Sequence, residues 1–473
     1  MRLLVGLPVS EKLGRRADPA EVPAPEHELG QTHARSTDLA LLHRAILRSL
    51  GHDSVVFACP AVPPSPPPRA DRPRYELNVR VASDLKEVAG DLTVRFTPNR
   101  PTKRLVFRLW PNGPLQRGEG SQLDVGDATA NGRTLPASRP DPTTLVLQVP
   151  LRAGQSVEVH LPWRLRVPLD ARDRVSRFAG GIRLGSFFPV LAWDPRRGWI
   201  TDPPARILAE SSTTPASDFD VRVDAPAGLE ALASGTKVGA DHWHAHGVRD
   251  VALAVARFRV VTRIVHAPRP VLLRVAVART SNVQGSTVLR MATRALERLS
   301  RLYGAYPWQT YTVVVPPDLH SVGIEYPTLT FIGASPILRV IVDHETAHQW
   351  FYSLVGNDQA RDPWLDEALA TWGQVQLGGG LPGSLAAAPA DQFQHVGAPM
   401  SYWNGHQIAY FREVYGGGVV ALSSLGTRRV NCALRHYAAQ DAYRIAQPGD
   451  LLDALNRFIP GAERRLRRFG IRR

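Results

Sequence analysis

The feature that most constrains this chain is a His-Glu-Thr-Ala-His run at 344–348, followed by eighteen residues and then Glu367. On a helix, residues i and i+4 lie on one face, so His344 and His348 can present two imidazole nitrogens to one metal ion. Two nitrogens and one carboxylate oxygen leave a fourth position for water, which is the open geometry of a catalytic zinc site. Glu345, beside the first ligand, is placed to take a proton from that water. The pattern predicts one Zn²⁺ per chain.

The residues around this run favour two helices. The stretch 338–342 is apolar enough to form a buried helix, and 349–351 continues it. Asp362 suits the N-cap of a second helix and Pro363 its first position. Glu367 then falls near the start of that helix, where it can face the first. The alternative is a buried helix whose histidines bind backbone carbonyls, but the spacing and the two helices favour a metal site.

The segment from Val342 to Trp372 resembles the zinc aminopeptidases of the aminopeptidase N family, a gluzincin family that includes leukotriene hydrolases. The resemblance follows the family's layout over roughly residues 75 to 460 and is closest to its short bacterial-type members. It implies a zinc ion at the three predicted ligands and a general-base role for Glu345. It also implies a thermolysin-like catalytic domain.

The run from Gly323 to Pro327 resembles the family's Gly-x-Met-Glu-Asn motif, whose glutamate binds the free α-amine of the substrate. The resemblance implies that Gly323 and Glu325 bind substrate. A carboxylate beside the cleft can pair with an ammonium group and so select N-terminal residues. The match is partial, because Ile324 and Tyr326 stand where the family has Met and Asn. A surface-loop glutamate is the alternative interpretation.

One family feature is missing. Aminopeptidases of this kind usually carry a second acidic or amide residue, contributed by the N-terminal domain, near the amine site. The corresponding region covers 178–182 and 187–193, and no acid occurs there before Asp194. A single amine anchor would bind a free N-terminus less tightly. Strict aminopeptidase specificity is therefore left open, whereas metal-dependent hydrolysis is still expected.

Tyr415 precedes a run of three glycines and resembles the tyrosine of the family's Tyr-x-Lys-Gly motif. The resemblance implies that its phenol donates a hydrogen bond to the developing oxyanion. Gly417 stands where the family has lysine, so the match is partial. Tyr402 and Tyr410 are the alternative candidates, and a plain core tyrosine is the structural alternative.

Three segments follow one another along the chain, which predicts an α+β multidomain protein. Residues 1–74 form an irregular N-terminal segment, and its Pro-rich end predicts a stiff polyproline linker. Residues 75–265 carry short alternating apolar runs separated by turn residues, which predict a β-rich domain. The family resemblance implies a saddle-like sandwich there. Residues 266–473 are expected to form the mainly helical catalytic domain, beginning with an amphipathic helix at 287–303.

Composition excludes several partner classes. The net charge is +14, and six arginines lie within 464–473. No nucleic-acid-binding motif accompanies them, so a solvated helix face is expected and a nucleic-acid partner is not. No apolar run approaches the roughly 18 residues of a membrane span. The run 56–59 looks like a lipoprotein cleavage box. However, Arg44, Arg48 and Asp53 interrupt the preceding stretch, so peripheral or lipid-anchored membrane contact is only an alternative.

Together these features predict a zinc-dependent metallopeptidase, with aminopeptidase activity on peptide substrates as the first interpretation. One alternative is a zinc endopeptidase or an epoxide hydrolase on the same scaffold. Another is a non-catalytic interaction module, against which the intact ligands and Glu345 argue. The sequence does not fix residue preference, oligomeric state or compartment, whether cytoplasmic, envelope or secreted.

Overall fold

The computed structural model describes residues 57–209, 212–381, 385 and 387–473 of the 473-residue chain. The chain divides into two compact units, and the unit that contains residues 61–473 holds every helix and strand given below. The predicted irregular segment lies outside the described residues up to position 56. Within the described ranges, no helix is both long and apolar enough to cross a membrane.

The largest sheet has nine strands. They span Arg74–Val81 (β1), Glu87–Phe96 (β2), Gln122–Val125 (β4), Thr129–Ala130 (β5), Arg133–Thr134 (β6), Val157–Arg166 (β9), Ser217–Asp224 (β15), Thr236–Gly239 (β17) and His242–Val248 (β18). Their order is β17-β18-β15-β1-β2-β9-β5-β6, with β4 also paired to β9. Residues of β1 alternate between exposed and buried, so Tyr75, Leu77 and Val79 point inward. One face of the sheet therefore packs on the core and the other is polar.

Two four-stranded sheets share that core. The first consists of β3 (Thr102–Arg108), β7 (Ala137–Asp141), β8 (Thr144–Leu151) and β12 (Val190–Leu191), and the second of β10 (Val175–Phe178), β11 (Gly181–Gly185), β16 (Glu230–Ala233) and β19 (Ala252–Ala256). Short elements join them: η1 (Trp110–Asn112), α2 (Pro114–Gly118), β13 (Trp193–Asp194) and β14 (Gly198–Trp199). Residues of all three sheets, such as Leu77, Phe107 and Leu253, belong to one buried cluster. The predicted β-rich N-terminal region is confirmed.

A five-stranded sheet begins the second half of this unit. Its strands are β20 (Phe258–His266), β21 (Pro270–Ala278), β22 (Thr310–Val315), β23 (Gly323–Ile324) and β24 (Leu329–Ile332), in the order β20-β21-β22-β24-β23. The amphipathic helix α3 (Gly285–Tyr303) packs on β20 and β21. Because β20 pairs with β21, we propose a domain boundary near residue 257 rather than at 265. The edge strand β23 presents Gly323 at one end of the sheet.

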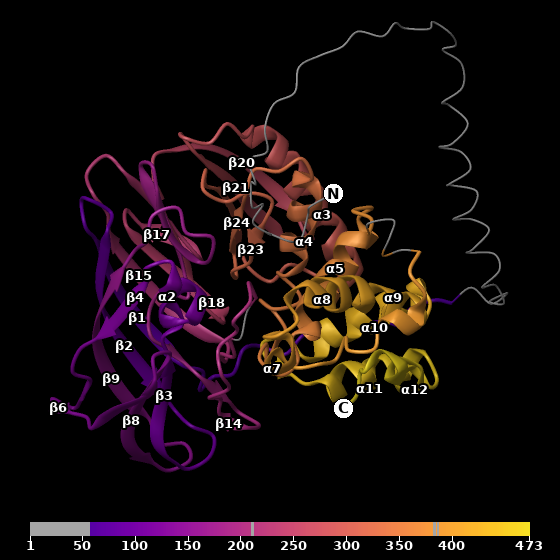
Figure 1. Cartoon of the computed structure of the whole chain (residues 1–473), viewed down its shortest axis with the longest axis horizontal. Coiled ribbons are helices and arrows are strands. Elements are labelled where there is room, and N and C mark those ends of the chain that lie inside the picture. The colour runs from indigo at the N-terminus through magenta and orange to yellow at the C-terminus, as the bar shows by residue number, and fades with distance from the viewer. Residues whose placement is uncertain (1–56, 210–211, 382–384, 386) are drawn as a thin grey trace, which may run out of the picture. The chain divides into compact units, whose positions relative to one another are not determined.

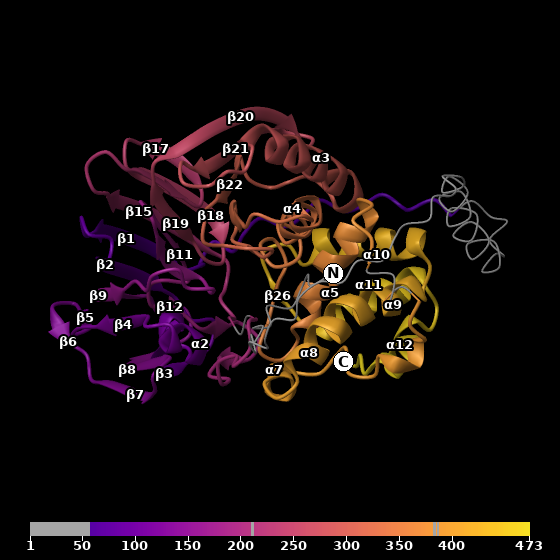
Figure 2. The same ribbon diagram turned by 45° about the horizontal axis from the view of Figure 1, so that its top comes forward.

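Helices fill the remainder. They span Leu338–Ala347 (α4), Trp364–Gln376 (α5), Met400–Trp403 (α7), Gln407–Tyr410 (α8), Gly418–Ser423 (α9), Thr427–Gln440 (α10), Pro448–Phe458 (α11) and Ala462–Leu466 (α12). Shorter elements are β25 (Gly356–Asn357), β26 (Ile445–Ala446), the 3-10 turns η2 (Ala390–Gln392) and η4 (Arg467–Phe469), and the π-helical turn η3 (Phe411–Gly417). The strands of the first half and the orange and yellow helices form separate groups, with β20 to β24 beside α3 and α4 (Figure 1). The turned view shows α3 lying along the outside of β20 and β21 (Figure 2).

Two buried arginines join the β-rich layers to the loops around α4. Arg249 donates from Nε to the carbonyl of Tyr352 at 2.9 Å and from Nη2 to the carbonyl of Arg444. Burial lowers the pKa of Arg249 to about 10, so the guanidinium stays charged at neutral pH. Arg183, on β11, pairs from Nε with Asp318 at 2.9 Å in the loop that leads to β23. These contacts hold the site loops against the N-terminal layers.

Candidate active site

Helices α4 and α5 pack against each other and carry the predicted metal ligands. His344 lies in the last turn of α4 and His348 directly follows its last residue, still bonded from its amide to the carbonyl of His344 at 3.3 Å. Helix α5 begins at Trp364, one residue later than predicted, and the Asp362 side chain does not cap it. That carboxylate instead faces Arg197 at 3.9 Å, so only its carbonyl serves the first turn.

The structure brings the three predicted ligands together. Nε2 of His344 lies 3.1 Å from Nε2 of His348 and 3.2 Å from Oε2 of Glu367, and the remaining side of this triangle is 3.5 Å. All three side chains are buried. A tetrahedral ion with bonds of about 2.0–2.1 Å has ligand–ligand distances of about 3.3 Å. The triangle therefore has the size that a zinc ion requires.

Two groups behind His348 decide which of its nitrogens faces the triangle. Its Nδ1 lies 2.7 Å from Oδ1 of Asp366 and 3.1 Å from the carbonyl of Phe351. The Phe351 carbonyl accepts from Nδ1 and the Asp366 carboxylate beside it favours a proton there, so Nε2 would be the nitrogen that faces a metal ion in the triangle. Oδ2 of Asp366 in turn accepts from Gln359 at 2.5 Å. The donor set fits a metal ion, because acceptor atoms converge there.

Asp366 is a residue that the sequence reasoning missed. A carboxylate behind a ligating histidine fixes its tautomer and orientation, and such partners matter for metal affinity. The sequence could have indicated this role, because Asp366 directly precedes the ligand Glu367. Consecutive residues of a helix point in different directions from its axis, so the two carboxylates can contact different sides of one histidine. One then reaches the ligand triangle and the other reaches the far side of His348.

Glu345 lies beside the triangle, with 5% of its surface exposed. Its Oε2 has no hydrogen-bond partner among the described residues, although it is buried. Burial raises the pKa of Glu345 well above its usual value, with the neighbouring Glu325 and Glu367 adding to the effect. An orphaned carboxylate oxygen with a raised pKa suits proton transfer to and from a small molecule in the site.

The loop of β23 closes on this carboxylate. A Cβ built on Gly323 would lie 2.4 Å from Cδ of Glu345, so the glycine leaves the space that the carboxyl group occupies. Glu325, two residues on, is 6% exposed and has its carboxylate within 4.8 Å of both Glu345 and His348. Burial, together with Asp366 and Glu367, raises the pKa of Glu325 to about 7. The predicted substrate-binding residues Gly323 and Glu325 therefore lie directly beside the predicted base Glu345.

Tyr415 lies directly against one of the predicted ligands. Its ring stacks on His344 with centroids 5.6 Å apart and an angle of 13°. Burial raises the pKa of the phenol well above its usual value, so the hydroxyl stays protonated and can donate. Tyr410 packs behind it, with ring centroids 5.9 Å apart, whereas Tyr402 stacks on His406 at 4.5 Å.

A π-helical turn places Tyr415, and such turns often occur at functional sites. The glycines after it permit close packing. A Cβ on Gly417 would lie 2.8 Å from the Phe393 ring, and one on Gly418 would lie 2.3 Å from the Ala368 Cβ on α5. A lysine at Gly417 would not fit this packing. The departure from the family motif therefore has a local steric reason.

The N-terminal layers contribute a cation to the surroundings of Glu325. Arg174 lies beside the buried Asp173, with Nη1 and Oδ1 2.8 Å apart. Burial opposes its charge, but Asp173 and then Tyr326 and Glu325 raise the pKa of Arg174 above its usual value. Asp173 and Arg174 precede the segment 178–193 in which a second acid was expected, so the sequence did not predict their place near Glu325.

Comparisons with known proteins agree with this geometry. Residues 288–398 match the peptidase family M1 domain. Human aminopeptidase RNPEPL1 is 34% identical over 177 residues, which cover 34% of this chain and 23% of that protein. Rat aminopeptidase B is 33% identical over 84 residues, covering 16% and 13%. The chain thus spans less than a quarter of the length of these relatives.

Solved structures match over a longer range. An M1 zinc metallopeptidase from Deinococcus radiodurans superposes with a TM-score of 0.59 and 20% identity, covering 85% of this chain and 95% of that one. A variant of that enzyme bound to the substrate Tyr-Ser-Ala gives a TM-score of 0.56 with 20% identity, covering 84% and 93%. These likenesses show a shared two-part fold.

Proposed function

Because the chain carries a peptidase family M1 domain, we propose that it is a zinc-dependent aminopeptidase that removes N-terminal residues from peptides. The observation that carries the proposal is the triangle of His344, His348 and Glu367 with a buried, unpartnered Glu345 beside it. When bound by these three residues, a zinc ion would polarise the scissile carbonyl and lower the pKa of water.

Glu345 would act as the general base. Burial raises its pKa above the usual value, so the carboxyl group is a stronger base that can accept the proton of water and return it to the leaving amine. Gly323 fixes the position of that carboxyl group by packing directly against it. Proton transfer of this kind needs heavy atoms within hydrogen-bond reach, so a fixed carboxylate contributes directly to the rate.

Tyr415 would donate its phenolic hydrogen bond to the oxyanion that develops on the substrate carbonyl. The stack on His344 holds the ring beside the ligand triangle, and the phenol keeps its proton and can donate it. Tyr402 stacks on His406 and not on a ligand, so Tyr415 is the better supported of the tyrosines.

Glu325 would bind the α-ammonium of the substrate. Its carboxylate lies within 4.8 Å of the Glu345 carboxylate and of a ring nitrogen of His348, so an ammonium bound there would lie beside the base and a metal ligand. A cation there gains a charge-assisted bond in a buried environment. Arg174 interacts electrostatically with Glu325 and so competes with a substrate ammonium for its charge. This favours a second candidate function, an endopeptidase that does not require a free amine.

One experiment separates these functions. The purified full chain, loaded with zinc and assayed for bound metal, is given free and N-acetylated aminoacyl substrates and short peptides. We expect hydrolysis of the free substrates and little of the acetylated ones, and Glu345→Gln should abolish both. Equal cleavage of blocked and free peptides would support the endopeptidase. Zinc binding without any hydrolysis would contradict both functions.

A further inference from the structure

Strand β18 carries a second group of metal-ligand side chains, far along the sequence from the catalytic helices. It reads His-Trp-His-Ala-His from His242, and strand alternation sends His242, His244 and His246 to one face. Trp243 between them is 1% exposed and anchors the strand in the core. On the neighbouring strand β15, Asp220 lies directly opposite His244 in the pairing register.

Three of these side chains converge. Nε2 of His242 lies 2.8 Å from Oδ1 of Asp220, and Nε2 of His244 lies 2.6 Å from Oδ2. The two Nε2 atoms are 3.1 Å apart, the same separation as in the catalytic triangle. His246 stands apart, with its Nδ1 3.6 Å from Asp218.

The backbone that carries this cluster is held on both sides. β18 pairs with β15 and with β17, so it is an interior strand of the sheet. The side chains of Asp220, His242 and His244 are 26%, 25% and 38% exposed. They are therefore ordered by the sheet yet open to an ion from solvent, as a metal site with an entry path requires.

We propose that Asp220, His242 and His244 form a second transition-metal site, separate from the catalytic triangle and without a catalytic role. Two imidazoles and one carboxylate are a donor set that suits Zn²⁺, Cu²⁺ and Ni²⁺, whereas Mg²⁺ and Ca²⁺ prefer oxygen ligands. Both Nε2 atoms face one carboxylate and each other, so a single ion between them would satisfy all three at once. A bound ion would connect β15 to β18 through side chains.

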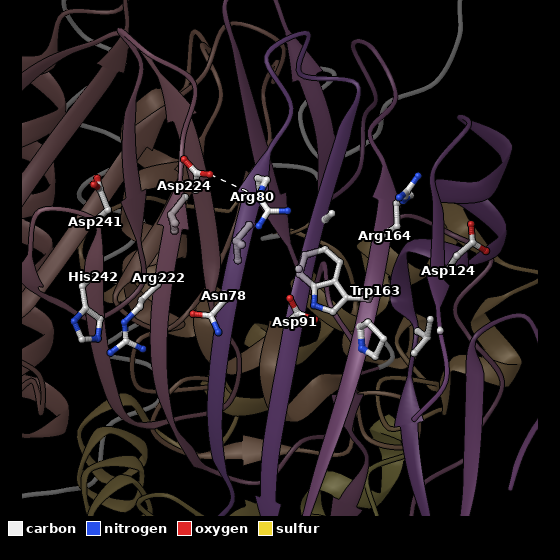
Figure 3. A pocket seen from close by; sticks show the side chains of 17 residues that line it. Asn78, Arg80, Asp91, Asp124, Trp163, Arg164, Arg222, Asp224, Asp241 and His242 are labelled. Atoms are coloured by element: carbon white, nitrogen blue, oxygen red, sulfur yellow. Dashed lines mark ion pairs between the residues drawn. The ribbon is translucent and has the colours of Figure 1, made fainter. Parts of the chain in front are cut away.

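The competing interpretation is that Asp220 simply accepts two hydrogen bonds. Arg222, two residues along β15, adds a cation to the same carboxylate, with Nη1 2.6 Å from Oδ1. Figure 3 shows Arg222 beside His242 at one edge of a hollow on the polar face of the sheet. A metal ion at Asp220 competes with this guanidinium, whereas a hydrogen-bonded Asp220 does not. The metal-site interpretation therefore predicts that removing Arg222 strengthens zinc binding, whereas the hydrogen-bonding interpretation predicts no change.

The test uses the full chain with His344→Ala and His348→Ala, so that the catalytic triangle no longer binds zinc and does not contribute to the measured metal content. Equilibrium dialysis against Zn²⁺, followed by metal analysis, should give one ion per chain. Adding His242→Ala or Asp220→Asn should weaken zinc binding by at least about 100-fold. Loss of a residue that only hydrogen-bonds to a metal ligand usually costs less than this. Zinc should also raise the melting temperature of the background protein and not that of the His242→Ala variant.

Two further variants keep the result interpretable. His160→Ala is the matched control, because His160 pairs with Asp91 at 3.3 Å on the same sheet and is in no described metal-ligand cluster. It should leave zinc affinity unchanged. Arg222→Ala should tighten binding by about tenfold, the scale for removing a nearby unit charge close to the surface. No zinc in the background protein, equal losses with His160→Ala, or no gain with Arg222→Ala would each overturn the site.

Discussion

Gly323→Ala is a sharp test of the active site, because it adds one methyl group at a known place. Gly323 has no positive φ, so alanine is compatible with its backbone. The added Cβ would lie 2.4 Å from Cγ, Cδ and Oε1 of Glu345, whereas ordinary contacts begin at 3.4 Å. The carboxyl group must therefore move by about 1 Å, and a misplacement of that size costs on the order of 10²-fold in rate.

The assay compares kcat on a free aminoacyl substrate with zinc content and melting temperature. We expect kcat to fall by about 10²-fold while the zinc content stays at the wild-type value, because the three ligands are untouched. Gly405→Ala is the matched control, since a Cβ there would meet nothing within 4 Å. It should be as active as the wild type.

A double-mutant cycle tests whether Gly323 acts through Glu345. In a Glu345→Gln background the base is already lost, so Gly323→Ala should cost little more. If Gly323→Ala alone keeps kcat near the wild-type value, the position of the Glu345 carboxyl group does not limit the reaction. If the two losses simply multiply, the glycine acts on something other than Glu345.

The remaining predictions concern single side chains around the ligand triangle. Glu345→Gln should retain zinc, measured by metal analysis, and lose about 10²–10⁴-fold in turnover, because the amide cannot accept a proton. Tyr415→Phe should lower kcat by about 10²–10³-fold with little change in KM, whereas Tyr402→Phe should be silent; the reverse result would move the oxyanion role to Tyr402. Asp366→Asn should weaken zinc affinity by about 10–100-fold in chelator competition, and unchanged affinity would exclude its role behind the ligand. Glu325→Ala should reduce kcat/KM for free substrates more than for acetylated ones, by about one to two decades, and an equal effect on both would exclude an amine anchor.

What the sequence predicted well depends on local geometry. The i, i+4 relation of His344 and His348 is a property of any helix, so the ligand pair could be recognised without a fold. The spacing to Glu367 added a second helix, and α4 and α5 do pack together. The alternating runs between 75 and 265 likewise report a property of single strands, and the β-rich region follows from them.

What the sequence did not predict depends on contacts between distant segments. The place of Arg174 near Glu325 follows from how the β-rich layers meet the loop of β23, which no local pattern encodes. The π-helical turn at Tyr415 depends on packing of its glycines against Phe393 and α5. The pairing of β20 with β21 is a hairpin that hydrophobic alternation alone does not assign to one domain or the other.

The buried guanidinium of Arg249 has a consequence for protein engineering. Its donors serve carbonyls of Thr214, Tyr352 and Arg444, which belong to three separate stretches of the chain. Gly356 lies flat against it, since a Cβ there would be 2.2 Å from its Cζ. A chimera that joins the strands of one homologue to the helices of another would inherit the arginine from one parent and most of its acceptors from the other. Crossover points chosen between elements therefore have to transfer this side chain and its acceptors as one module.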